Sequence, residues 1–190
     1  ALVPQWAQAG GLDELLARFD DPETRRRIRG EIADRIEHDR GGGDPDNVVI
    51  SLCEWDRSLE GQSLADILAD RDVASDFLTA ADLVMELIQR GGARAIYHAM
   101  DESDVERIMQ HPSTAIGSDG GVSVFGVGVP HPREYGTFPR VLGRYVRERG
   151  VLTLEEAVRK MSGATAQRLG LRQRGLLQES FYADITVFDP

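Results

Sequence analysis

The stretch from residue 94 to residue 121 constrains the fold of this chain more than any other feature. An apolar run at 94–98 is followed by a short helical pattern at 103–110 and by a second apolar run at 114–117. Strand, helix and strand in such close succession are typical of parallel strands that are joined by a right-handed crossover. The sequence therefore predicts an α/β fold with a parallel sheet.

An aspartate, Asp119, stands directly after the second predicted strand, between Gly117-Ser118 and Gly120-Gly121. Proteins with parallel sheets place reactive groups at the carboxyl ends of their strands, and nearby glycines let a substrate or a metal approach the main chain. An aspartate after a strand is, however, more often a turn former or a helix cap. Asp119 is thus a candidate catalytic residue with a structural alternative.

A loop rich in Gly, Pro, His and Val leads from Asp119 to a helix predicted to begin near Phe138. Such a loop, roughly twenty residues long, tends to be functional when it lies inside a compact domain. It contains His131 and Arg133, and an arginine is suited to gripping a carboxylate through two parallel hydrogen bonds. The alternatives are a structural salt bridge from Arg133 to Glu134 or Asp119, and a structural or exposed position for His131.

The other predicted elements are mostly helical. Ile28, Ile32 and Ile36 recur every four positions, which indicates one buried face of a helix that opens at Asp21-Pro22, with the arginines at 25–27 on a solvated face. Thr153 and Glu156 have the spacing of a capping box. Further helices are expected at 11–16, from 63 onward, and at 80–88, 140–149, 154–161 and 164–169, and strands are expected at 48–53 and 183–190.

Composition and charge exclude several classes of protein. The net charge of −10 argues against a general attraction to nucleic acid. No apolar run approaches the roughly 20 residues of a membrane span, and the N-terminus has no recognisable export signal. The single cysteine, Cys53, is expected to be buried, cannot form an internal disulfide and fits a reducing compartment. We therefore expect a cytoplasmic protein without nucleic-acid or membrane partners; its oligomeric state is undetermined.

Several ordered motifs resemble one enzyme family. The runs Ile116–Gly120, His131–Arg133 and Tyr135–Gly143 closely resemble the C-terminal signature of the N-acyl-D-amino-acid deacylases, or D-aminoacylases, of the amidohydrolase superfamily. The segments that follow in this family are similar to 154–162, 167–171 and 183–190, and a family insertion is more loosely similar to the segment that begins at 2–7. The resemblance spans nearly the whole chain.

The resemblance implies a fold as well. This chain would be the C-terminal part of a metal-dependent-hydrolase (β/α)8 TIM barrel, with 93–97 as the seventh barrel strand and 114–118 as the eighth. A small α/β insertion subdomain would occupy 1–75, the last two βα units of the barrel 76–175, and the start of a small β-sandwich domain 176–190.

The resemblance also implies a reaction, the zinc-dependent hydrolysis of the amide bond in a small-molecule N-acyl-D-amino acid. In such enzymes zinc activates a water molecule while an aspartate takes up its proton and later delivers a proton to the departing amine. By resemblance Asp119 is that catalytic aspartate, with at most a weak role as a ligand of a second metal ion. Arg133 matches the residue that binds the substrate carboxylate.

The metal ligands of the family cannot be assigned in this sequence. No His-x-His pair appears near the start, and Cys53 lies in the predicted insertion. The four histidines, His38, His98, His111 and His131, form no close ligand pair. Together with the missing initiator methionine, this predicts that roughly the first six barrel strands lie outside this chain. We expect zinc in the full-length enzyme, and neither tight zinc binding nor activity in the isolated chain.

Two alternatives stay open. The first is another amidase or dipeptidase of the same superfamily that shares the chemistry of Asp119. The second is a non-catalytic binding or assembly module that has kept the fold and lost the metal site. The sequence does not specify the preferred acyl group, the D-side chain, or the roles of His98 and His131.

Overall fold

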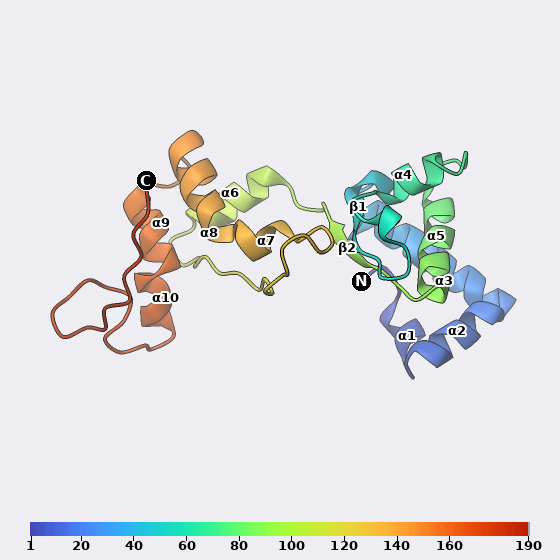
Figure 1. Cartoon of the computed structure of the whole chain (residues 1–190), viewed down its shortest axis with the longest axis horizontal. Coiled ribbons are helices and arrows are strands. Elements are labelled where there is room, and N and C mark those ends of the chain that lie inside the picture. Colours follow the sequence, from blue (N-terminus) through green and yellow to red (C-terminus); the bar gives the residue numbers. More distant parts are fainter. Residues whose placement is uncertain (190) are drawn as a thin grey trace. The chain divides into compact units, whose positions relative to one another are not determined.

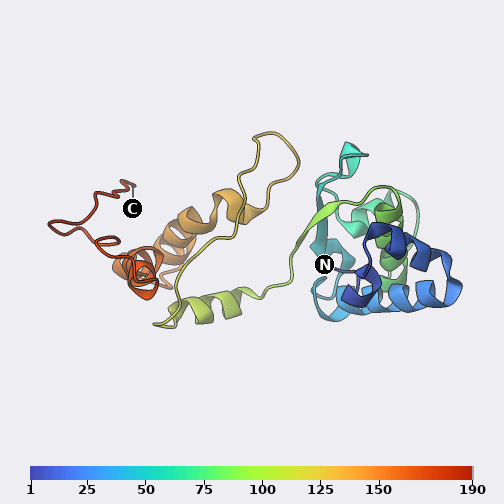
Figure 2. The same cartoon turned by 90° about the horizontal axis from the view of Figure 1, so that it is seen from below.

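A computed structural model of the chain describes residues 1–189, which form two compact units. The first unit comprises Ala1–Met100 and Val124–Pro130, and the second comprises Asp101–Ser123 and the residues from His131 onward. In Figures 1 and 2, the strand pair lies at one edge of the first unit with blue to green helices beside it, and the second unit is built from helices and extended segments. No helix among residues 1–189 is both long and apolar enough to cross a membrane.

The first unit is a layer of helices beside a small two-stranded sheet. Its elements are α1 (Gln5–Gln8), α2 (Leu12–Asp20), α3 (Pro22–His38), η1 (Pro45–Asn47), β1 (Val48–Leu52), η2 (Arg57–Leu59), α4 (Leu64–Ala69), α5 (Phe77–Gln89) and β2 (Arg94–Tyr97). Asp21 caps α3 by accepting a hydrogen bond from the Thr24 amide. Ile28, Ile32 and Ile36 are fully buried, as their spacing predicted, and α3 packs along α5.

The sheet of the first unit has two antiparallel strands. In its register Val49 of β1 lies opposite Ile96 of β2. The prediction of a parallel sheet that joins 94–98 to 114–117 is therefore wrong, because residues 114–117 form no strand. Each main-chain amide needs an acceptor, and the amide of Ile116 finds one on a helix, at the Lys160 carbonyl, instead of on a neighbouring strand.

The second unit is mainly helical and has a smaller core. Its elements are α6 (Glu102–Gln110), α7 (Pro132–Tyr135), α8 (Thr137–Arg140), the π-helix η3 (Val141–Glu148), α9 (Leu154–Met161) and α10 (Gly163–Arg168). The predicted helix at 140–149 is thus the end of α8 followed by η3. The buried apolar cluster of this unit consists of Met109, Val141, Tyr145, Leu152 and Ala157.

Two further predictions for the second unit need correction. Residues 183–189 form no strand, since no described segment pairs with them, and Pro190 lies outside the described residues. The Thr153 hydroxyl accepts a hydrogen bond from the Glu156 amide as expected, but the Glu156 carboxylate binds Arg159 and does not complete a capping box.

The two strands of the described part do not form a barrel. The predicted barrel, and the division of the chain at 75 and 175, remain predictions about a complete protein. For the candidate site, the second unit provides residues 114–123 and the helix α7, and the loop residues 124–130 between them belong to the first unit.

Candidate active site

Asp119 and Arg133 meet in the second unit as an exposed ion pair. The Nε atom of Arg133 lies 3.2 Å from Oδ1 of Asp119. The Asp119 side chain is 81% exposed and that of Arg133 is 46% exposed. The structure therefore brings together the two candidate residues, in the salt bridge that the sequence offered as the structural alternative for Arg133. An exposed pair of this kind is weak, because water screens both charges. Both groups are accessible to a small molecule.

Ser118 fixes the turn that presents Asp119. Its hydroxyl donates a hydrogen bond to the carbonyl oxygen of Arg133 (2.9 Å) and accepts one from the amide of Gly120 (3.1 Å). A Cβ atom on Gly120 would lie only 2.8 Å from that same carbonyl oxygen, so the close approach of the two segments requires glycine. Sequence reasoning did not single out Ser118. The signal was a hydroxyl residue two positions before a turn glycine, which is typical of a local side-chain turn.

Arg133 is presented by the short helix α7. The Nδ1 atom of His131 accepts a hydrogen bond from the Arg133 amide at 3.1 Å, and Pro132 occupies the first helical position. The hydroxyl of Thr137 donates to the Arg133 carbonyl at 3.1 Å. His131 therefore has a structural role as the cap of α7, which is the alternative that the sequence favoured for it.

The described residues do not fit a zinc site. Among residues 1–189, no group of three or more His, Cys, Asp or Glu side chains is arranged to hold a metal ion. Cys53 is fully buried in the apolar core of the first unit, as expected. The Nδ1 atom of His111 accepts a hydrogen bond from the Ser113 amide, and His98 is exposed just after β2. The arrangement offers a carboxylate and a guanidinium for acid–base work and anion binding.

Comparison with known proteins shows which family this chain matches. A family model described as "Amidohydrolase family" matches residues 3–190. Over 142 residues the chain is 46% identical to a D-aminoacylase of Alcaligenes xylosoxydans xylosoxydans, a match that covers 75% of this chain and 27% of the relative. Over 183 residues it is 40% identical to an N-acyl-D-glutamate deacylase of the same organism, covering 96% of this chain and 33% of the relative.

Solved structures of deacylases also match the chain. A crystal structure of D-aminoacylase superimposes with a TM-score of 0.60 at 45% identity, covering 72% of this chain and 27% of that one. The N-acyl-D-glutamate deacylase of Bordetella bronchiseptica, complexed with zinc and a phosphonate mimic of the tetrahedral intermediate, gives a TM-score of 0.62 at 36% identity, with coverage of 90% and 35%. The chain thus spans about a quarter to a third of the length of these relatives.

Proposed function

We propose that this chain, which belongs to the amidohydrolase family, is part of an enzyme that hydrolyses N-acyl-D-amino acids, with Asp119 as its proton-transfer residue. The resemblance to the N-acyl-D-amino-acid deacylases that the motifs predicted is confirmed by the comparisons. The activity remains a proposal, because the chain covers only a third or less of the curated relatives' length. The observation that carries it is the accessible Asp119–Arg133 pair.

The chemistry proposed for Asp119 is that of a general base and then a general acid. Hydrolysis of an amide requires removal of a proton from the attacking water and delivery of a proton to the departing nitrogen. A carboxylate performs both steps if it stays close to the reacting atoms. The 81% exposure of the Asp119 side chain leaves it open to a bound substrate and a water molecule.

The proposed role of Arg133 is to bind the α-carboxylate of the substrate. A guanidinium has five N–H donors in a planar fork, and Asp119 lies next to one of them, Nε. A substrate carboxylate that replaces Asp119 at Arg133 would leave the aspartate free to act on water. Because the exposed pair is weak, this exchange has a small energetic cost. Selectivity for the D-enantiomer would follow from the fixed directions of the carboxylate, the side chain and the scissile amide.

Because residues 1–189 do not fit a metal site, a metal ion in the complete enzyme would need ligands from outside this chain. One solved D-aminoacylase has a binuclear metal centre, and the solved N-acyl-D-glutamate deacylase is complexed with zinc. We expect zinc in the complete enzyme and only weak zinc binding by the 190-residue chain. Isothermal titration of the isolated chain with zinc tests the second expectation, and a stoichiometric, tight complex would contradict it.

The activity is tested by assaying the full-length gene product with N-acetyl-D-amino acids and their L-enantiomers. We expect the D-substrates to be hydrolysed at least about 100-fold faster, since a site built around one enantiomer misplaces the other. The 190-residue chain should show no deacylase activity. Faster turnover of cyclic amides or dipeptides would favour the related amidases. The absence of any amide hydrolysis by the full-length product would favour a binding or assembly module.

A further inference from the structure

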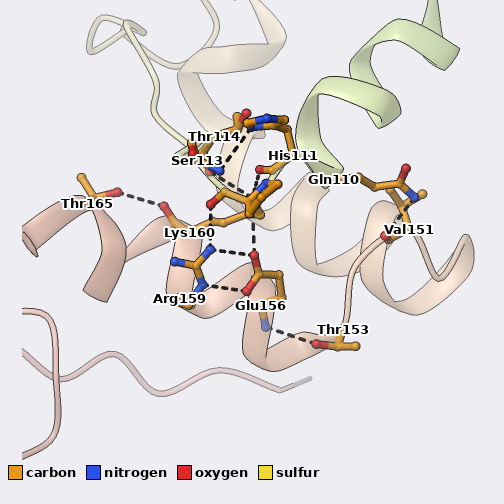
Figure 3. A network of polar contacts seen from close by, with 11 residues as sticks. Gln110, His111, Ser113, Thr114, Val151, Thr153, Glu156, Arg159, Lys160 and Thr165 are labelled. Atoms are coloured by element: carbon orange, nitrogen blue, oxygen red, sulfur yellow. Dashed lines mark hydrogen bonds and ion pairs between the residues drawn. The ribbon is translucent and has the colours of Figure 1, made fainter. Parts of the chain in front are cut away.

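Lys160, in the last turn of α9, has no solvent-exposed surface. The removal of an ammonium group from water costs several kcal/mol unless other groups replace the water. The Nζ atom of Lys160 donates hydrogen bonds to the carbonyl oxygens of His111 (2.5 Å) and Thr114 (3.1 Å). It also lies 3.4 Å from Oε1 of Glu156. Figure 3 shows these contacts converging on the lysine from the helix and from the segment at 111–114.

The same turn of α9 holds this segment through two more bonds. The main-chain carbonyl of Lys160 accepts the amide of Ile116 at 3.1 Å. The guanidinium of Arg159 donates to the carbonyl oxygen of Pro112 at 3.0 Å. Residues 111–116 are thus attached to α9 at four points, with Lys160 responsible for three of them. These bonds satisfy main-chain groups that have no neighbouring strand in the described part of the chain.

Glu156 and Thr165 hold Lys160 itself in place. Glu156 binds Arg159 through both carboxylate oxygens, at 2.7 and 2.8 Å, and hydrogen bonding to Arg159 is the largest cause that lowers the pKa of Glu156 to about 2. Glu156 therefore remains ionised at neutral pH beside the lysine. The hydroxyl of Thr165 donates to the Lys160 carbonyl at 2.9 Å. The lysine is fixed at both its side chain and its main chain (Figure 3).

The anchored segment leads directly to Asp119. Asp119 follows Ile116 by three positions, which is about 10 Å of extended chain. Ser118, the residue directly before the aspartate, is held separately, because its hydroxyl donates a hydrogen bond to the Arg133 carbonyl. The position of the Asp119 carboxylate is therefore set by two supports, α9 through Lys160 and α7 through Ser118.

We propose that Lys160 is a positioning residue for Asp119, acting through the segment at 111–116; this inference rests on the proposed function. An apolar side chain at position 160 would fill the space but leave the carbonyl groups of His111 and Thr114 without their donor. The segment would then move relative to α9, and the carboxylate would move with it. A shift of about 1 Å in a reacting group lowers the rate by up to about 100-fold.

The test is the Lys160→Met variant of the full-length gene product, assayed with an N-acetyl-D-amino acid. We expect kcat per folded molecule to fall by about 30-fold or more, while KM changes by less than about threefold, because Arg133 stands on α7 and keeps its own supports. Glu155→Gln, at an exposed position of the same helix, is the matched control and should retain the parent kcat. Hydrogen exchange at 114–119 should accelerate in Lys160→Met, whereas exchange in α3 should not change.

The outcomes separate this inference from the proposed function. An unchanged kcat in Lys160→Met, in a protein that is inactivated by Asp119→Asn, would overturn the role of Lys160 and leave the function intact. Full activity in Asp119→Asn would overturn the function itself. If Lys160→Met does not fold, Glu156→Gln replaces it, since it weakens the hold on the lysine and leaves its carbonyl bonds. We expect about a threefold to tenfold loss of kcat there, and an unchanged kcat would overturn the proposal.

Discussion

The unit built on α3 and α5 and the unit that carries Asp119 are stabilised by different interactions. The first has an extensive apolar core that draws residues from α2, α3, α4, α5 and β1. The second buries a smaller apolar cluster together with the charged side chain of Lys160, whereas the described residues of the first unit bury no charged side chain. Burial of apolar surface tolerates small changes of geometry, whereas a buried charge depends on particular partners. The unit with the candidate site should therefore respond to changes of charge, and the other unit to changes of volume.

The largest effect on stability is expected in the core of the first unit. Ile32→Ala removes a fully buried side chain from α3 and should lower the free energy of unfolding by about 3 kcal/mol, because it leaves a cavity. Both tryptophans, Trp6 and Trp55, lie in this unit, so urea unfolding followed by tryptophan fluorescence reports on it. Leu12→Ala, at a side chain that is 56% exposed, is the control and should change stability by less than about 0.5 kcal/mol. An equal loss of unfolding free energy in Ile32→Ala and Leu12→Ala would contradict the view that the buried apolar core stabilises the first unit.

The next effect is expected at Arg133 and concerns binding. Arg133→Gln in the full-length gene product should raise KM for an N-acyl-D-amino acid by about 10-fold to 100-fold. The neutral amide of glutamine cannot replace the two charge-assisted hydrogen bonds of a guanidinium to the substrate carboxylate. Steady-state kinetics measures this effect. Arg107→Gln, at an exposed position of α6, is the matched control. A normal KM in Arg133→Gln would leave the arginine with only the structural pairing to Asp119.

The sequence was most informative where local pattern decides the structure. The spacing of Ile28, Ile32 and Ile36 predicted the buried face of α3, because residues four positions apart lie on the same face of an α-helix. The strand at 114–117 was predicted from its apolar residues and does not form, because a strand depends on neighbours that the segment does not have. A lysine in a last helical turn is normally a favourable exposed charge. The burial of Lys160 is a property of tertiary packing and was not foreseen from the sequence.

The sequence predicted which residues form the candidate site better than it predicted the contacts between them. Asp119 and Arg133 were singled out by their positions, after a predicted strand and in the loop that follows it, and the motif resemblance gave them their roles. Their salt bridge was offered as an alternative to substrate binding. The bond from Ser118 to the Arg133 carbonyl joins residues fifteen positions apart, a pairing that no local pattern encodes. The sequence thus identified the candidate reactive groups, and the structure added the groups that hold them.

A smaller effect is expected from a helix cap in the first unit. The Ser63 hydroxyl accepts the amide of Asp66, and the Asp66 carboxylate accepts the amide of Ser63 in return. Ser63→Ala should therefore lower the free energy of unfolding by about 1 kcal/mol. Asp70→Asn, at the opposite end of α4, serves as the control and should not destabilise the unit, because a negative charge there is unfavourable to the helix dipole. Tryptophan fluorescence during urea unfolding measures both variants.

The smallest effect concerns the pH dependence of the second unit. The pKa of Glu156 is lowered from its ordinary value of 4.5 to about 2, first by Arg159. Its ionised form therefore stabilises the fold above about pH 4.5, and this contribution is lost as the pH falls towards about 2. Calorimetric unfolding at about pH 6 and about pH 3 should show a smaller acid-induced loss in Glu156→Gln than in the parent chain. An identical loss in both proteins would contradict a stabilising role for the ionised carboxylate.

The activity of Asp119→Asn in the full-length gene product, with an N-acetyl-D-amino acid as substrate, decides whether Asp119 is the proton-transfer residue. The asparagine keeps the size of the side chain and removes its ability to take up a proton. We predict that kcat falls by about 100-fold to 10,000-fold while the protein stays folded. A kcat within about threefold of the parent value would contradict the assignment of Asp119 as the proton-transfer residue.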